Sequence, residues 1–445
     1  MRPVTGLPPA ALLVLYTAVA LAPLALAGWS GSRENDFLAE LSVGAALVAY
    51  AMMLLQFITS GRFERLSGRI GIDRTMHFHQ LAARFAAVLV IAHPLLPRLP
   101  TDLTQVGTLP TALAIMFRAP HLLSGVLAWG LMLVIVLMAI LRRRLPIPYE
   151  AWRATHAVGA LAVALAGAHH TFSVGTYSRE PALFWFWCTL LGVALASIAF
   201  VYAVRPWLQA REGYRVTENR EIGTGIRELT LDPLPGRGLR YRAGQFAWIN
   251  LRRPALPVFD HPFSFTSAAL EAPRVRLTIK ARGDFTGTLQ ALAPGTPVVV
   301  DGPHGNFGLH GHPGDAVCLV AGGIGISSIM GVLRDLHASR DPRPIALLYG
   351  ARNVQQLAYA DEIRAMQGEL RLRIHLRLDE PPQGWAGGVG PMDARAFREV
   401  LSGVDPARSV CLVCGPTPMI LAAERHLIAA GVPPRSVIYE RFEYA

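Results

Sequence analysis

Residues 76–97 read MHFHQLAARFAAVLVIAHPLLP and are apolar enough to cross a bilayer, yet they contain His79 and His93. Ionisable side chains inside a membrane span are costly and are usually kept for function. The two histidines are fourteen residues apart, which places them about 21 Å apart along a helix and within about 40° of the same face. Neutral imidazole is a common axial ligand of haem iron, so the stretch predicts a helix with one ligand near each membrane surface.

A second apolar stretch, residues 152–171, contains His156 and the adjacent pair His169 and His170. His170 fits a straight helix, whereas His169 points about 140° away from His156 unless the helix has a kink or a π-bulge. A single buried histidine is more often a hydrogen-bonded core residue than a ligand. Two pairs of near-matched spacing on two helices instead predict two stacked metal macrocycles, each held by one histidine from either helix.

Six apolar stretches, each close to the ~20 residues that a spanning helix needs, predict a multi-pass membrane domain in contact with lipid. They cover residues 9–28, 38–60, 76–97, 119–141, 152–172 and 182–204. Arginines gather in the loops after the second and fourth stretches and behind the sixth, which predicts an inner-membrane protein with both termini in the cytoplasm. The net charge of +11 belongs in large part to these loops, so nucleic-acid binding is not predicted.

The rest of the chain has the pattern of a soluble protein. From Tyr214 onward, short alternating runs predict an antiparallel β-barrel or sandwich that ends near Gly305, and a new domain begins near Gly314. The expected domains are residues 1–208, 209–312 and 313–445. The four cysteines predict no disulfide framework and no iron–sulfur cluster. Cys411 and Cys414 match a CxxC pattern only formally, because they lie in a strand that runs into a Gly-Pro turn.

A glycine-rich turn lies between a strand and a helix in the last domain. Residues 316–321 predict a buried strand, residues 322–325 read GGIG, and a helical stretch follows directly. Backbone amides at such a turn and the positive end of the helix favour phosphate. The next strand ends at Arg352, where an arginine suits the 2′-phosphate of NADPH and an acidic residue would suit NADH. The turn and this arginine predict an NADPH site.

The segment from His261 to Ser267, HPFSFTS, is similar to the flavin-binding motif HPF[ST]xTS of NADPH oxidases and ferric reductases. With the six apolar stretches and the dinucleotide turn, the chain resembles prokaryotic members of that superfamily over nearly its whole length. The resemblance implies a multi-domain membrane protein with an all-α six-helix transmembrane bundle that holds two b-type haems. An antiparallel β-barrel FAD domain and an α/β Rossmann-like NADP domain would follow.

The resemblance also implies which residues bind each cofactor. Phe263 would pack on the flavin, Ser264 would approach its reactive edge, and a terminal aromatic ring would shield it until nicotinamide enters. The implied FAD contacts are His261, Pro262, Phe263, Ser264, Thr266, Lys280, Arg282, Gly283, Thr286, Phe442 and Tyr444. The implied NADPH contacts are Gly322, Gly323, Ile324, Gly325, Ser327, Arg352, Cys414, Gly415 and Pro416. Ligand spacings of fourteen and thirteen are typical of the family, which selects His169 as the outer ligand with His170 as the alternative.

The expected activity is electron transfer from cytoplasmic NADPH through FAD to an inner haem on His79 and His156. An outer haem on His93 and His169 would pass the electrons to an acceptor outside. The outer loop, residues 99–118, is mostly uncharged, which favours a closed lid and dioxygen, reduced to superoxide, as the acceptor. A ferric chelate and a periplasmic partner protein are the alternatives. A haem-free transporter with histidine relays is disfavoured by the dehydrogenase half.

Overall fold

The structure is a computed structural model that describes residues 6–29, 36–60, 63, 68–98, 109–177, 180–209, 213–236, 238–251 and 256–440. The chain divides into two compact units between Arg205 and Pro206. The first unit is helical and the second contains both β-sheets. Each unit is described by itself.

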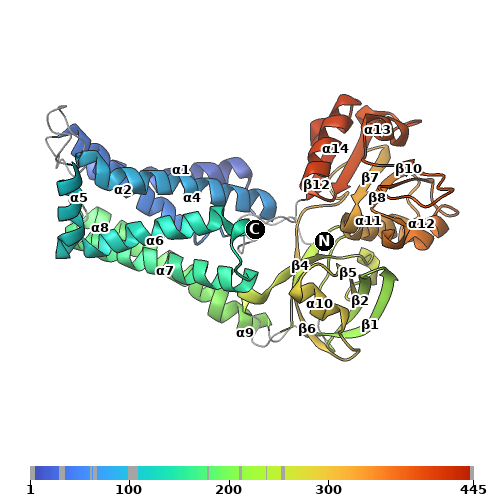
Figure 1. Ribbon diagram of the computed structural model, residues 1–445, viewed down its shortest axis with the longest axis horizontal. Coiled ribbons are helices and arrows are strands. Elements are labelled where there is room, and N and C mark those ends of the chain that lie inside the picture. Colours follow the sequence, from blue (N-terminus) through green and yellow to red (C-terminus); the bar gives the residue numbers. More distant parts are fainter. Residues whose placement is uncertain are drawn as a thin grey trace. The chain divides into compact units, whose positions relative to one another are not determined.

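The first unit is a bundle of long apolar helices (Figure 1). Within the described residues, six helices are long and apolar enough to cross a membrane, which confirms the predicted multi-pass domain. Their outward faces carry exposed apolar side chains such as Val88, Leu137 and Val158, as expected of surfaces that meet lipid. The helices are α1 (Pro9–Trp29), α2 (Phe37–Leu55), α4 (Ile72–Leu95), α6 (Leu123–Ile140), α7 (Tyr149–Val174) and α8 (Pro181–Ala199).

Two short features differ from the expected pattern of spans and loops. A further helix, α5 (Leu109–Arg118), lies inside the segment that was expected to be an outer loop. Ten residues are too few to cross a membrane, so the sequence pattern did not separate this helix from a loop. Beyond α8, the stretch Phe200–Val204 is π-helical and leads into α9 (Arg205–Gln209), which lengthens the last span.

The bundle core brings small residues of α7 against large ones of α2. The Tyr50 hydroxyl donates a hydrogen bond of 3.0 Å to the carbonyl oxygen of Ala164. A Cβ atom at Gly167 would lie 2.8 Å from the Tyr50 ring, so the ring fits only because this position is glycine. Close approach at small residues is the usual basis of helix packing in membranes.

The second unit begins with an antiparallel six-stranded sheet of order β4-β3-β6-β1-β2-β5. Alternate residues such as Leu229, Leu231, Leu277 and Ile279 are buried in its core, as the alternating sequence pattern predicts. The sheet confirms the expected antiparallel domain. Its strands are β1 (Gly213–Gly223), β2 (Ile226–Pro233), β3 (Phe246–Asn250), β4 (His261–Ser264), β5 (Val275–Lys280) and β6 (Pro297–His304), with helix α10 (Asp284–Gln290).

A parallel six-stranded sheet of order β10-β9-β8-β7-β11-β12 follows. One face packs on α11 and α12, and the other packs on α13 and α14, so the strands are buried on both sides (Figure 1). This arrangement confirms the predicted α/β domain. The strands are β7 (Ala316–Gly322), β8 (Ile345–Ala351), β9 (Leu372–Leu378), β10 (Gly388–Val389), β11 (Ser409–Cys414) and β12 (Val437–Glu440). The helices are α11 (Ile326–Ala338), α12 (Ala360–Met366), α13 (Ala394–Val400) and α14 (Thr417–Ala429).

Candidate functional site

Two histidines from different helices face each other inside the bundle. The ring centres of His79 on α4 and His156 on α7 are 6.4 Å apart, with an angle of 60° between the ring planes. Two imidazoles that bind one metal ion from opposite sides, at roughly 2 Å per bond, have ring centres about 6 Å apart. The Nδ1 atoms of both rings are buried and lack a hydrogen-bond partner among the described residues. The spacing and the free nitrogens fit an iron held between the two rings.

His93, at the other end of α4, is oriented by Ser42 of α2. The His93 Nδ1 atom lies 2.9 Å from the Ser42 hydroxyl and 3.0 Å from the Ser42 carbonyl oxygen. The Ser42 hydroxyl also donates a hydrogen bond of 2.6 Å to the His93 carbonyl oxygen. A hydrogen bond on one ring nitrogen fixes the tautomer and presents the other nitrogen to a metal. Ser42 therefore has the role of a positioning residue that the sequence did not reveal.

The two adjacent histidines of α7 lie in different surroundings. Every residue of α7 from Tyr149 to Val174 is α-helical, so α7 contains no π-bulge that would bring His169 onto the face of His156. His169 is exposed and its Nδ1 atom contacts the Ser124 hydroxyl at 2.9 Å. His170 is half-buried, lies close enough to His93 for an electrostatic interaction, and packs against Gly125, where a Cβ atom would lie 2.5 Å from its ring. This geometry favours His170 as the partner of His93.

The predicted flavin segment lies on β4 and forms an aromatic cluster with α10. The His261 ring stacks on Phe285 with ring centres 3.7 Å apart, and Phe263 lies 6.4 Å from Phe285. Phe285 belongs to the turn 283–286 that the resemblance assigns to the FAD phosphates, but its stacking on His261 was not predicted. Apolar ring faces of this kind suit the face of an isoalloxazine ring.

Ser264 is the point at which the flavin segment meets the dinucleotide helix. Its hydroxyl lies 2.8 Å from the Ser328 hydroxyl of α11, and both side chains are buried. The Cys414 thiol lies 3.5 Å from the same Ser328 hydroxyl, and burial raises the pKa of this thiol to about 12. Cys414 is therefore a neutral thiol at neutral pH. The sequence singled out Ser327, but the residue that joins the two segments is Ser328.

The dinucleotide turn lies where the strand order reverses. From β7 the chain adds β8 and β9 on one side, and then β11 on the other, so the carboxyl ends of β7 and β11 border a topological switch point. Ligands of open α/β sheets bind at such a crevice. A Cβ atom at Gly325 would lie 2.2 Å from the Cys414 carbonyl oxygen, and one at Gly322 would lie 2.3 Å from the Met419 sulfur. The glycines are thus required for the two predicted NADPH segments to meet.

Three cations lie together at the end of β5. Burial and the charges of Arg282 and Arg352 lower the pKa of Lys280, whose ammonium donates a hydrogen bond of 2.9 Å to Gln356. Arg352 also pairs with Glu380 at 2.9 Å, and both side chains are exposed. The cluster suits phosphate groups. A bound 2′-phosphate would have to share Arg352 with Glu380, a partner that the sequence analysis did not identify.

Other predicted residues have roles apart from cofactor contact. The Thr266 hydroxyl is fully buried and donates to Glu228 at 3.2 Å. The Thr286 hydroxyl accepts hydrogen bonds from the amides of Arg282 and Gly283 and so begins α10. Phe442 and Tyr444 lie outside the described residues. Cys411 and Cys414 belong to cores on opposite faces of the sheet, so they do not act together as a CxxC pair.

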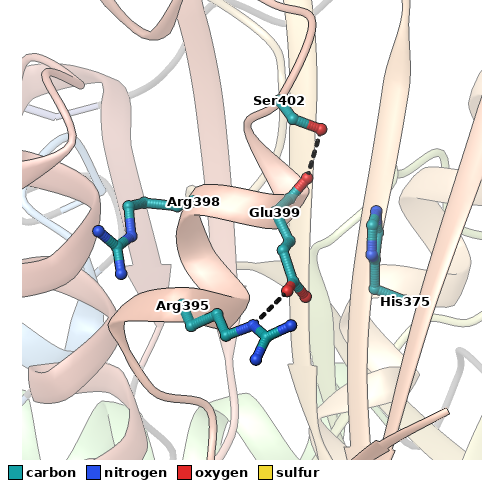
Figure 2. A pocket seen from close by; sticks show the side chains of 5 residues that line it. All are labelled: His375, Arg395, Arg398, Glu399 and Ser402. Atoms are coloured by element: carbon teal, nitrogen blue, oxygen red, sulfur yellow. Dashed lines mark hydrogen bonds and ion pairs between the residues drawn. The ribbon is translucent and has the colours of Figure 1, made fainter.

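A hollow of about 560 Å³ on the last domain is separate from these residues. It is lined by His375, Arg395, Arg398, Glu399 and Ser402 (Figure 2). Figure 2 shows Arg395 directed at Glu399, with which it pairs at 2.8 Å, while Arg398 points away from His375. Of the predicted site residues, all of which apart from the two C-terminal aromatics are described, none lines the hollow.

Three family models match the chain, one in each of the predicted membrane, FAD and NADPH domains. "Ferric reductase like transmembrane component" matches residues 45–167, "FAD-binding domain" matches residues 229–306, and "Oxidoreductase NAD-binding domain" matches residues 319–425. The first match contains His79, His93 and His156, and it ends two residues before His169 and His170. The other two contain the flavin segment and the dinucleotide turn.

Individual relatives cover about half of the chain. Ferredoxin–NADP reductase B of Sorangium cellulosum is 30% identical over 52% of this chain and 96% of its own length. The electron transfer component of xylene/toluene monooxygenase of Pseudomonas putida is also 30% identical, and the chain spans only 64% of that relative's length.

Among solved structures, flavohemoglobin of Malassezia yamatoensis with bound FAD and heme has a TM-score of 0.50 and 16% identity. The match covers 92% of this chain and 99% of that one. At this identity the likeness concerns the fold alone. The family models and the reductase relative together indicate a ferric-reductase-like membrane domain followed by FAD-binding and NAD-binding domains. The chain belongs to the NADPH oxidase and ferric reductase superfamily, in which a ferric-reductase-like transmembrane domain is fused to FAD- and NAD-binding domains of the ferredoxin–NADP reductase type.

Proposed function

We propose that the protein carries electrons from cytoplasmic NADPH, through FAD and two bis-histidine b-type haems, to dioxygen on the outer side of the membrane. The observation that supports this proposal most directly is the pairing of histidines on α4 and α7 at two levels of the bundle. Residues 1–208 would hold the haems, residues 209–312 the FAD and residues 313–445 the NADPH.

In this proposal His79 and His156 hold the inner haem, and His93 holds the outer haem together with His170. The electrostatic interaction of His170 with His93 and the lack of a π-bulge in α7 support this choice over His169, which the family spacing favours. Bound FAD would accept a hydride and release electrons singly, as haem iron requires. The buried hydroxyls of Ser264 and Ser328 and the neutral thiol of Cys414 would exclude water where nicotinamide and flavin meet.

The charged loops support the proposed sidedness. Arg69 and Arg74 precede or begin α4, Arg142 and Arg144 follow α6, and Arg205 follows α8. These ends of the helices share one side of the membrane if the six helices alternate in direction. By the positive-inside rule that side is the cytoplasm. The FAD and NADPH domains, which follow Arg205, would then also be cytoplasmic.

The acceptor is proposed from the segment on the outer side. α5 consists of apolar residues except for Thr111 and Arg118, and Met116 is buried. An apolar helix over the outer haem favours a small uncharged acceptor over a charged chelate or a partner protein. The reaction would be one NADPH and two dioxygen molecules giving NADP⁺, a proton and two superoxide ions. The ferric-reductase match makes reduction of a ferric chelate the second candidate.

The acceptor can be tested with the purified protein loaded with haem and FAD in detergent. We expect fast NADPH consumption in air and reduction of cytochrome c that superoxide dismutase suppresses. Slow turnover in air with fast reduction of a ferric chelate under argon would assign the protein to the metal reductases. Slow turnover with both acceptors would leave the partner protein as the electron acceptor.

Replacement of Arg352 by alanine should change the preference between the two nicotinamide cofactors. A charge-assisted hydrogen bond contributes about 1.5–3 kcal/mol, so the KM for NADPH should rise by roughly 10- to 100-fold while the KM for NADH stays nearly unchanged. Glu380→Gln is the matched variant: it frees Arg352 from its carboxylate partner and should lower the KM for NADPH. Equal effects of Arg352→Ala on both cofactors would remove the case for a 2′-phosphate contact.

A further inference from the structure

One face of α11 follows the flavin segment residue by residue. Ser328 contacts the Ser264 hydroxyl at 2.8 Å, and Arg334 donates to the Thr266 carbonyl oxygen at 2.8 Å. Asp335 accepts a hydrogen bond of 2.9 Å from the Ala269 amide. Ser328 and Asp335 are seven residues apart, about two helical turns, and so lie on one face of α11. Because α11 also begins at the dinucleotide turn, a single helix links the predicted NADPH and flavin sites.

Gly331 lies at the closest point of this contact. A Cβ atom there would lie 2.4 Å from the Phe265 carbonyl oxygen and 3.6 Å from that of Ser267. The atoms that a side chain at this position would meet belong to the backbone, and a backbone atom cannot move aside by rotating a side chain. Any larger residue would therefore push the helix away from the flavin segment. The distance between the two segments is therefore fixed by the absence of a side chain at Gly331.

Arg334 is the centre of a buried ionic network across the two domains. Its Nη1 atom lies 2.8 Å from Glu228 of β2, and its Nε and Nη2 atoms bind both carboxylate oxygens of Glu362 of α12 at 2.7 and 2.8 Å. Burial would by itself raise the pKa of Glu228, but Arg334 and the hydrogen bonds from Tyr359 and Arg220 lower it below its ordinary value. Glu228 and Arg334 therefore remain charged although both are at most 5% exposed.

Tyr359 completes the network from a backbone conformation that side chains rarely adopt. Its φ angle is 63°, in the left-handed region, at the residue that precedes α12. Its hydroxyl donates to Glu228 at 2.7 Å and contacts the Thr278 hydroxyl of β5, and the Arg334 guanidinium lies 4.9 Å from its ring centre. A bulky residue keeps such a conformation only where its surroundings require it.

A network of this kind does not serve stability efficiently. Apolar residues of similar volume often replace buried ion pairs without loss of stability, and the best-attested use of buried ionic groups is to specify one arrangement. Here the arrangement is the register of α11 on the segment 264–269. We propose that Arg334 is a positioning residue that fixes this register and so sets the distance over which hydride passes from NADPH to the flavin. This inference rests on the dehydrogenase half of the proposed function.

Two variants test the proposal in the full-length protein with FAD and haem bound. Arg334→Lys keeps the positive charge that Glu228 needs, but an ammonium group cannot bind Glu228, Thr266 and Glu362 at once in a planar fork. Gly331→Ala leaves every charged group in place and only separates the two segments. Arg364→Lys is the matched control, because this exposed residue of α12 pairs with Asp361 of the same helix, its one ion pair among the described residues.

The readout is the rate of flavin reduction at saturating NADPH under argon, together with FAD content and the Kd for NADP⁺. A misplacement of about 1 Å can slow a reaction by roughly 100-fold, so each variant should reduce flavin at least about tenfold more slowly. We expect full FAD content, a Kd for NADP⁺ near that of the parent, and normal kinetics in Arg364→Lys. A merely structural role would lower FAD content and affinity but leave the rate per bound flavin unchanged.

Parental rates of flavin reduction in both variants would overturn the proposal. So would loss of FAD from both, which would make the network a requirement for folding. If Arg334→Lys alone loses FAD, the rate of flavin reduction in Gly331→Ala decides between the proposal and a merely structural role. Because flavin reduction precedes electron transfer to haem, normal flavin reduction with failed haem reduction would contradict the transmembrane proposal and leave this one standing.

Discussion

Replacement of His93 by alanine is expected to remove one of two haems and to stop electron delivery to the outer acceptor, while NADPH still reduces the flavin. Ser42 contacts the Nδ1 atom of His93, as the hydrogen-bond partner of a metal-ligating histidine does. Loss of a partner of a metal ligand typically costs about 10–100-fold in affinity or activity, so loss of the ligand itself should cost more. Haem content by pyridine haemochrome and NADPH-driven cytochrome c reduction measure the two effects.

The histidines of the chain offer matched controls for this prediction. His77→Ala changes an exposed histidine on the same helix and should retain both haems. His170→Ala should reproduce the His93→Ala result, whereas His169→Ala should keep both haems and weaken only the contact with Ser124. Loss of one haem in His169→Ala, with both haems kept in His170→Ala, would assign His169 as the outer ligand. Parental electron delivery in His93→Ala would contradict the two-haem path.

Replacement of Gly325 by alanine is expected to abolish reduction of the flavin by NADPH. The added Cβ would lie 2.2 Å from the Cys414 carbonyl oxygen and 2.8 Å from the Gly415 amide nitrogen, both of which are backbone atoms. Overpacking of this kind typically costs about 1–3 kcal/mol, and the displaced segments border the crevice between β7 and β11. The Kd for NADP⁺, the rate of flavin reduction and the melting temperature should all worsen.

Gly368→Ala is the control for this variant. Its Cβ would lie 3.8 Å from the nearest atom, the Ala365 carbonyl oxygen, in an exposed turn, so binding and stability should stay near the parental values. Haem content should be unchanged in both variants, because the bundle is a separate unit. Parental NADPH affinity in Gly325→Ala would place the dinucleotide elsewhere on the domain.

The sequence was sufficient to predict elements that are determined locally. Hydropathy identified all six long helices because a span is defined by its own twenty or so residues. The strand, glycine turn and helix at residues 316–338 were recognisable for the same reason. α5 was missed because ten mostly apolar residues between two spans carry no signal that distinguishes a short helix from a loop.

Features that depend on contacts between distant residues were not predicted. Arg334 and Glu228 are 106 residues apart, and Tyr359 and Glu228 are 131 apart, so no local pattern connects them. The pairing of Arg352 with Glu380 depends on the adjacency of β8 and β9. Spacing alone left His169 and His170 both open, and the proposal of His170 depends on contacts with distant residues, namely His93 and Gly125.

The most direct test of the central claim is to mix one equivalent of NADPH with the purified, FAD- and haem-loaded protein under argon and to follow flavin and haem absorbance together. The proposed path predicts that the flavin bleaches first and that the b-type haem α-band then rises until two haems are reduced. A flavin that becomes reduced while the haem stays oxidised would contradict electron transfer through the histidine pairs.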